Sequence, residues 1–241
     1  MYCKLRGKTM KKLVFLLLLL TLCLGLAACA ASDPTPAPTP SEKAQASEET
    51  PEPSDDGLPD IDPNSWQFVL VNPWNEISGD APALENFEGV PFDARIIGSL
   101  SDFAQGARDA GYSFRAFSGY RDYATQAYLY NRKVEQVGEA KARTIVAYPG
   151  TSEHHTGLAA DIADGHYELL TSELENTGLY KWMVEHCAEY GFIVRYPNGK
   201  SDVTGIIYEP WHFRYVGVEA ATYIMENDLT LEEFLALYEN R

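Results

Sequence analysis

Apolar residues recur at helical spacing in some stretches of the chain and alternate in others. In residues 91–111, for example, Ile96, Leu100, Phe103 and Ala107 lie three or four residues apart. The expected helices are residues 91–111, 121–138, 174–191, 218–228 and 230–240. The expected strands are residues 66–72, 112–119, 157–164, 192–197, 204–210 and 211–217.

The order of these elements indicates the fold class. Long helices come first, short strands crowd together late, and no regular strand–helix alternation is present. The last strands follow one another closely, which suggests an antiparallel meander. We therefore expect a single α+β domain over residues 64–241, with a small antiparallel sheet and flanking helices.

The chain starts with a basic segment followed by a short apolar run. Lys and Arg are concentrated in residues 4–12, and "LVFLLLLLTLCLGLAA" follows. This order is typical of a secretory signal peptide, and the run is shorter than the roughly 20 residues that span a bilayer. "LAAC" ends at Cys29 and resembles the bacterial lipobox, so we expect a lipoprotein signal peptide in residues 1–28 and a lipid anchor on Cys29. The alternative is an ordinary signal peptide, with Cys29 incidental.

A second segment, residues 29–63, is rich in proline and acidic residues and poor in large apolar ones. Such a composition cannot bury enough surface to offset chain entropy, so it predicts a disordered spacer. After cleavage and lipidation, Cys187 would be the one remaining thiol, so no intramolecular disulfide is expected. The net charge of −16 makes nucleic acid an improbable partner, because phosphate binding requires a basic surface.

Histidines and acids gather in "GTSEHHTGLAADIADG", residues 150–165, and in "YEPWHFRYVG", residues 208–217. Zinc prefers His nitrogen and carboxylate oxygen as ligands. The candidate ligands are His154, His155, Asp161, Asp164, His166, His186, Glu209 and His212. His186 lies in an expected helix and matches no ligand spacing, His166 follows an expected strand in a turn, and Asp164 before a glycine is most simply a turn residue.

Strand alternation narrows this set. It places Asp161 alone among alanines on one strand face, where an unpaired carboxylate is costly and a metal would compensate it. Pro210 argues against a helix through Glu209 and His212, so the helical two-histidine zinc motif is excluded. Glu209 could lie over a metal held by His212 without binding it, as a general base requires. Spacing does not distinguish His154 from its neighbour.

Three separated segments resemble one family. "SGYRDYATQ", "SEHHTGLAADI" and "YGFIVRYPNGKSDVTGIIYEPWHFRYVG" are similar, in this order, to segments of the VanY-type zinc D-alanyl-D-alanine carboxypeptidases, a family that includes L,D-carboxypeptidases. The resemblance extends from about Trp66 to Gly217 or beyond. It implies the fold shared by hedgehog domains and D-Ala-D-Ala peptidases.

The resemblance also assigns roles. It implies zinc bound by His154, Asp161 and His212, with Glu209 as the general base and Arg121 stabilising the oxyanion. The substrate-binding candidates are Ser118, Tyr120, Gln126, Ser152 and Trp211. Where relatives often carry glutamine, this chain has His155, for which an outer-shell role stays open.

The implied activity is zinc-dependent removal of the C-terminal D-alanine from peptidoglycan stem peptides, outside the membrane to which Cys29 anchors the protein. Whether the specificity is D,D or L,D stays open, since the motifs do not determine it. The alternatives are a peptidoglycan-binding domain without turnover and a cell-wall endopeptidase of the same fold.

Overall fold

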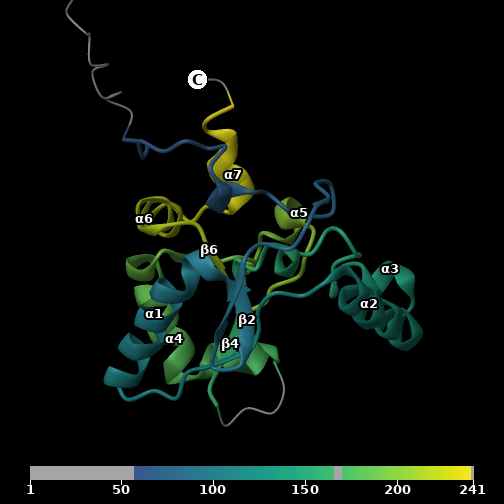
Figure 1. Cartoon of the computed structure of the whole chain (residues 1–241), viewed down its shortest axis with the longest axis horizontal. Coiled ribbons are helices and arrows are strands. Elements are labelled where there is room, and N and C mark those ends of the chain that lie inside the picture. Colours follow the sequence, from purple (N-terminus) through teal and green to yellow (C-terminus); the bar gives the residue numbers. More distant parts are fainter. Residues whose placement is uncertain (1–56, 166–169, 240–241) are drawn as a thin grey trace, which may run out of the picture. The chain divides into compact units, whose positions relative to one another are not determined.

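The computed structural model describes residues 57–165 and 170–239 (Figure 1). The expected signal peptide, Cys29, most of the spacer and His166 lie outside the described residues. The α-helices are α1 (Ile97–Asp109), α2 (Tyr123–Val137), α3 (Glu139–Ala142), α4 (Gly178–His186), α5 (Ser201–Thr204), α6 (Val218–Glu226) and α7 (Leu231–Ala236). The strands are β1 (Leu84–Phe87), β2 (Val90–Asp93), β3 (Arg115–Ser118), β4 (Ala159–Ala163), β5 (Phe192–Val194) and β6 (His212–Tyr215). The 3-10 helices are η1 (Trp66–Phe68), η2 (Ala94–Ile96), η3 (Glu153–Thr156), η4 (Ser172–Asn176) and η5 (Cys187–Tyr190).

The central sheet has the order β3-β4-β6-β5, and all its neighbouring strands are antiparallel. Figure 1 shows α1 and α4 together at one side of the sheet and α2 with α3 at the other. The predicted α+β class with a small antiparallel sheet is confirmed. None of the helices in residues 57–165 and 170–239 is long and apolar enough to cross a bilayer.

Strand alternation divides the core between two apolar clusters. Phe192 and Phe213 pack with Phe103 of α1 in the larger cluster, which fills the space between the sheet, α1 and α4. Ile193, one residue along β5, points to the other side and joins a second cluster with α6 and α7. Strand β5 therefore has apolar contacts on both faces, while β4 and β6 carry the polar side chains Asp161, His212 and Arg214 on the face opposite the larger cluster.

Two predicted strands are wrong. Residues 66–72 begin as a 3-10 helix, and Arg214 Nη2 donates to the carbonyls of Gln67 (2.9 Å) and Val69 (2.8 Å). A buried side chain thus satisfies backbone groups that a strand would have paired. Residues 204–210 are not a strand either. Helix α5 ends at Thr204 and is capped by Gly205 with φ +76°, and the buried Ile206 lines a cavity instead of joining the sheet.

The helix expected over residues 91–111 starts later, because its first residues form a hairpin. Strands β1 and β2 pair around Glu88 (φ 51°) and Gly89 (φ 88°), the left-handed pair that a two-residue hairpin turn requires. Asp93 then caps η2 by accepting from the backbone N–H of Arg95. The Glu-Gly pair was the signal for this hairpin.

The predicted spacer extends to residue 63, but its last residues contact the domain. Tyr238 Oη donates to the carbonyl of Pro59 (2.8 Å), Asp60 N–H donates to Glu219 (3.3 Å), and Ile61 packs against the second apolar cluster. The predicted boundary at Asn64 is therefore too late, because apolar residues at the end of the proline-rich segment find partners on α6 and α7.

This packing makes a truncation test possible. A protein starting at Asn64 is expected to lose about 1–3 kcal/mol of unfolding free energy relative to one starting at Gly57, because it loses the packing of Pro59 and Ile61. Urea unfolding of both proteins measures the difference. Coincident transitions would show that residues 57–63 do not stabilise the domain.

Candidate metal centre and active site

The register of the central sheet brings the acidic residue of β4 next to two predicted site residues. Asp161 pairs with His212 on β6 and with Ser118 on β3. Its neighbours Ala160 and Ile162 point into the apolar core, so the Asp161 side chain points to the opposite face. The sheet therefore fixes the carboxylate at the centre of the site.

His154, Asp161 and His212 form a buried cluster whose ligand atoms all lie within 4.8 Å of one another. His154 Nε2 is 3.2 Å from Asp161 Oδ2, and His212 Nδ1 is 3.1 Å from Asp161 Oδ1. Ligands bound tetrahedrally to zinc at about 2.0–2.1 Å lie about 3.3 Å apart. The two observed separations, each to a different oxygen of Asp161, are close to this value.

The tautomer of His154 leaves one nitrogen for a metal. Its Nδ1 lies 2.6 Å from the carbonyl of Gly119 and can only donate to it, so Nε2 carries the lone pair that faces Asp161. Gly157 turns the chain back after η3 with φ +69°, and a Cβ there would lie 2.7 Å from the backbone nitrogen of Asp93. This turn allows a loop histidine to lie beside β4.

His212 has a carboxylate on each side. Its Nδ1 faces Asp161, and its Nε2 lies 3.4 Å from Glu153 Oε2. Burial alone would lower the pKa of His212, but the carboxylates of Asp161 and Glu153 raise it to about 9. A metal ligand must be deprotonated. Zinc would therefore replace the Nδ1 proton, while Nε2 keeps its proton toward Glu153.

Glu153 belongs to a buried ionic network behind the metal ligands. Its Oε1 accepts from Arg195 Nε (2.6 Å) and from Arg214 Nη1 (2.6 Å). Arg195 also makes two hydrogen bonds to Glu232, at 2.8 and 2.6 Å. Burial would raise the pKa of Glu153, but the two arginines hold it well below its usual range. The residue is a carboxylate that orients the His212 ring.

An unpaired polar atom at the site supports the metal assignment. Asp161 Oδ1 is buried and makes no hydrogen bond within the described structure. Burial would raise the pKa of Asp161, but His154 and His212 hold it well below its usual range. A buried anion between two imidazoles is the environment that a divalent cation stabilises. The residues present therefore fit zinc.

Glu209 lies beside the cluster and outside it. His212 N–H donates to the Glu209 carbonyl (3.2 Å), which closes a turn with Pro210 at its second position, where proline is favoured. Glu209 Oε2 is 3.7 Å from His212 Nδ1. The three-residue metal group does not include Glu209. Burial raises the pKa of Glu209 to about 8.

Arg121 is held above the same carboxylate. Its Nη1 donates to Gln126 Oε1 (2.7 Å) and its Nη2 donates to Ser118 Oγ (2.8 Å), while Nη2 lies 3.8 Å from Asp161 Oδ2. Gln126 in turn donates to the carbonyl of Ala147 (2.7 Å). The guanidinium is therefore fixed, and its remaining N–H groups can bind an oxyanion.

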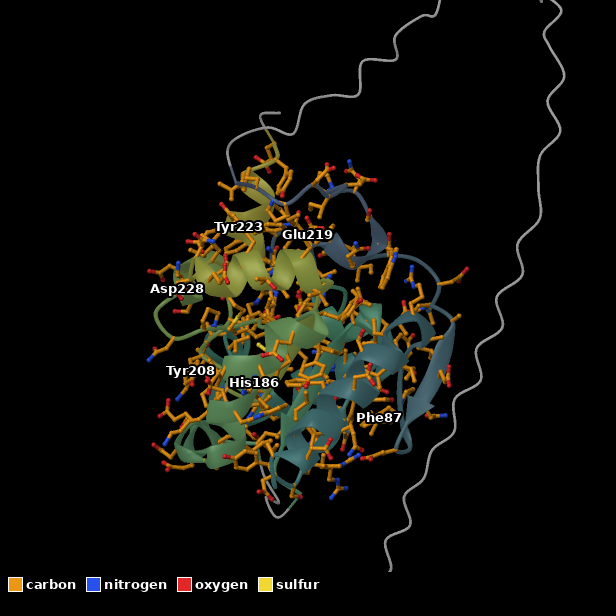
Figure 2. All side chains as sticks on the ribbon, turned by 90° about the vertical axis from the view of Figure 1, so that its left-hand side faces the viewer. Phe87, His186, Tyr208, Glu219, Tyr223 and Asp228 are labelled. Carbon is orange, nitrogen blue, oxygen red and sulfur yellow. The ribbon has the colours of Figure 1, made fainter. Side chains whose placement is uncertain are left out.

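His155 uses both ring nitrogens away from the metal cluster. Its Nδ1 lies 2.7 Å from the Arg121 carbonyl, and its Nε2 accepts from the N–H of Gly150 (3.1 Å). The sequence left open an outer-shell role for His155. In the structure, His155 holds the backbone of Arg121 in place through this hydrogen bond. His186, labelled on α4 in Figure 2, lies 2.8 Å from Glu189 Oε1 and does not belong to the metal group.

A cavity of about 410 Å³ opens onto these groups. The metal cluster, Glu209 and Arg121 all line it. Of the substrate-binding candidates, Gln126, Ser152 and Trp211 line the cavity, whereas the part of the chain that the structure describes does not place Ser118 or Tyr120 in its wall. Ser118 supports Arg121, and the backbone N–H of Tyr120 donates to Pro91. Direct contact between these candidates and a substrate stays a prediction.

The sequence interpretation missed Glu153, Arg195 and Arg214 as functional residues. A signal was present, because β6 alternation places Arg214 on the same side as His212, and a buried arginine requires an acid. The acid next to His154 in the η3 turn is that partner.

Comparison with known proteins agrees with this arrangement. Residues 91–218 match the family model of VanY, D-alanyl-D-alanine carboxypeptidase. A D-alanyl-D-alanine carboxypeptidase of Enterococcus faecalis is 40% identical over 188 residues, which cover 72% of this chain and 67% of the relative. The matched regions cover between 42% and 67% of the curated relatives' lengths.

Two solved structures have similar folds. A mutant of the vancomycin resistance D,D-pentapeptidase VanY in complex with Zn(II) superposes with a TM-score of 0.65 at 39% identity, covering 71% of this chain and 99% of that one. The LdcB LD-carboxypeptidase has a TM-score of 0.63 at 39% identity, covering 69% of this chain and 84% of that one. The chain therefore belongs to the VanY D-alanyl-D-alanine carboxypeptidase family.

Proposed function

We propose that the protein is a zinc-dependent carboxypeptidase that removes the C-terminal D-alanine from peptidoglycan stem peptides. The observation that supports it best is the joint placement of a three-ligand cluster, Glu209 outside that cluster, and Arg121 around one cavity. A binding domain without turnover needs no general base, so this placement favours an enzyme. The zinc-bound VanY relative supports the choice of metal.

His154 Nε2, an Asp161 oxygen and His212 Nδ1 would hold the zinc ion. When bound, zinc acidifies water and polarises a peptide carbonyl as a Lewis acid. The protein groups perform the proton transfers. Glu209 accepts the proton of the attacking water and returns it to the nitrogen of the departing D-alanine. A cation next to Glu209 favours its carboxylate, the form that can accept this proton.

Arg121 acts on the developing negative charge. Its guanidinium is fixed by Gln126 and Ser118, so little reorganisation is required when the carbonyl oxygen becomes an anion. Because Arg121 is largely buried, its charge is weakly screened; burial lowers its pKa, and Asp161 opposes this shift.

The specificity is tested with two stem peptides side by side. One is a pentapeptide ending in D-alanyl-D-alanine, and the other is a tetrapeptide ending in a single D-alanine. Mass spectrometry of the products reads out the reaction. Loss of one alanine from the pentapeptide indicates D,D activity, and loss of one alanine from the tetrapeptide indicates L,D activity. The similarity to the LdcB LD-carboxypeptidase makes L,D activity a specific candidate. Separation of two cross-linked stems would identify an endopeptidase, and unchanged masses would identify a binding domain.

We further propose that the protein is anchored outside the cytoplasmic membrane through a lipid on Cys29, with residues 29–56 as a tether. The "LAAC" sequence after the apolar run supports this location. Replacing Cys29 with alanine is expected to release the protein from membranes, because about 0.8 kcal/mol per buried CH₂ is lost with the acyl chains. Membrane fractionation combined with a lipid label measures this release. A variant that still sediments with membranes and carries the label would refute the anchor.

A further inference from the structure

Helix α2 presents one face to the cavity. Gln126, Leu129, Lys133 and Gln136 line it at intervals of three and four residues, and Arg132 lines it next to Lys133. At the beginning of this face, Gln126 holds Arg121 at the reaction site. The cavity therefore extends from the metal cluster along nearly three turns of α2.

Arg132 and Lys133 carry positive charge that no acid compensates within residues 57–165 and 170–239. Neither side chain makes an ion pair there, although the whole chain has 35 acidic and only 19 basic residues. Among the described residues, Arg95, Arg108, Arg121, Arg143, Arg195, Lys200 and Arg214 have acidic partners, whereas Arg115, Lys141 and Lys181 do not. The guanidinium of Arg132 instead lies 5.6 Å from the ring centre of Tyr128. Both residues thus line the cavity without an acidic partner in the part of the chain that the structure describes.

The separation along α2 indicates which part of a substrate they reach. Arg132 and Lys133 follow Gln126 by about two helical turns, or roughly 10 Å at 1.5 Å per residue. An extended peptide covers this distance in about three residues. The leaving group of a carboxypeptidase is one residue, so this end of the cavity faces the part of the peptide that the enzyme retains. The apolar side chains of Leu129, Ile145 and Val146 line the cavity as well and suit the aliphatic part of that segment.

We propose that Arg132 and Lys133 form a subsite for a carboxylate on the retained part of the stem peptide. This inference rests on the proposed function and adds a substrate class to it: stems with a free carboxylate before the scissile bond, in preference to amidated stems. Arg132 is exposed and Lys133 half-buried, so the subsite contributes to binding and not to the chemical step.

Two pentapeptides test the subsite. Both end in D-alanyl-D-alanine, and they differ only in that the carboxylates before the scissile bond are free in one and amidated in the other. The zinc-loaded wild type is expected to prefer the free acid about three- to tenfold in kcat/KM, mostly through KM, and the preference should decrease with rising salt. The double variant Arg132→Gln/Lys133→Gln should lose the preference while its kcat and zinc content stay near wild type.

A matched control removes the same charge elsewhere. Arg115 and Lys141 are exposed and do not line the described cavity, so Arg115→Gln/Lys141→Gln should keep the preference. An unchanged preference of Arg132→Gln/Lys133→Gln for the free-acid pentapeptide would overturn the proposal. An equal decrease of kcat/KM for both pentapeptides in Arg132→Gln/Lys133→Gln would also overturn the proposal. The two cations would then bind a group that both peptides share, such as the terminal carboxylate.

Binding separates this proposal from the proposed function. Calorimetry measures the Kd of the two corresponding tetrapeptides, which keep the part of the stem under test. If zinc-loaded wild type cleaves neither the pentapeptides nor the tetrapeptides but binds the free-acid tetrapeptide more tightly, and Arg132→Gln/Lys133→Gln loses this difference, the subsite stands and the hydrolytic function is wrong. Equal Kd values in the wild type would refute the subsite whether or not cleavage occurs.

Discussion

Glu209→Gln is expected to reduce turnover of stem peptides by at least about a hundredfold, the lower end of general acid–base contributions. Glutamine preserves the shape of the side chain but cannot accept a proton. The turn around Pro210 and the His212 backbone bond remain, so the metal ligands should not move. Steady-state kinetics and metal analysis of the same preparation measure both effects, and zinc content is expected close to wild type.

Two results would contradict this role for Glu209. A variant purified without zinc would show that Glu209 is a metal ligand, against its position outside the three-residue group. Near-normal turnover would show that another group accepts the proton. Arg121→Ala provides a comparison, because it removes an oxyanion donor at the same cavity and should also keep its zinc while losing turnover.

His212→Ala is expected to lose zinc and activity together. The change removes one of three ligands and leaves Asp161 without the imidazole that lies 3.1 Å from it. It also leaves the buried Glu153 without its histidine partner. Dialysis against buffered zinc, followed by metal analysis, should therefore show a large drop in affinity.

His155→Gln is the matched control for this prediction. Glutamine can donate to the Arg121 carbonyl and accept from Gly150, as His155 does. The variant should therefore keep its zinc. A zinc-free His155 variant together with a zinc-loaded His154 variant would reverse the assignment of the two neighbouring histidines.

Much of the site could be predicted because strand alternation and the turn at Pro210 are local properties. Asp161 faces away from the apolar core, as alternation predicts, whereas its pairing with His212 is a register that only the folded sheet shows. Glu209 lies in a turn before β6, as the proline indicates. The choice of His154 over His155 came from resemblance alone, and the structure explains it by their different hydrogen bonds.

What the sequence did not reveal depends on long-range contacts. The stretch 66–72 has strand-like alternation, but it lies where Arg214 binds its carbonyl groups. Glu153 gains its role only when Arg195 and Arg214 meet it across the fold, 42 and 61 residues along the chain. From the sequence alone, Arg132 and Lys133 are ordinary surface cations on a helix. Only the structure shows that both line the cavity.

The central claim is that this metal site hydrolyses the bond before a terminal D-alanine. The most direct measurement is D-alanine release from a pentapeptide stem and from a tetrapeptide stem, supplied separately, by full-length protein that is zinc-loaded, then chelated, then reloaded with zinc. The account predicts one D-alanine per peptide from at least one of the two stems with the loaded protein, loss of release after chelation, and recovery with zinc. Undiminished release from protein verified to be free of metal would contradict it, as would the absence of release from both stems by protein that carries one zinc per chain.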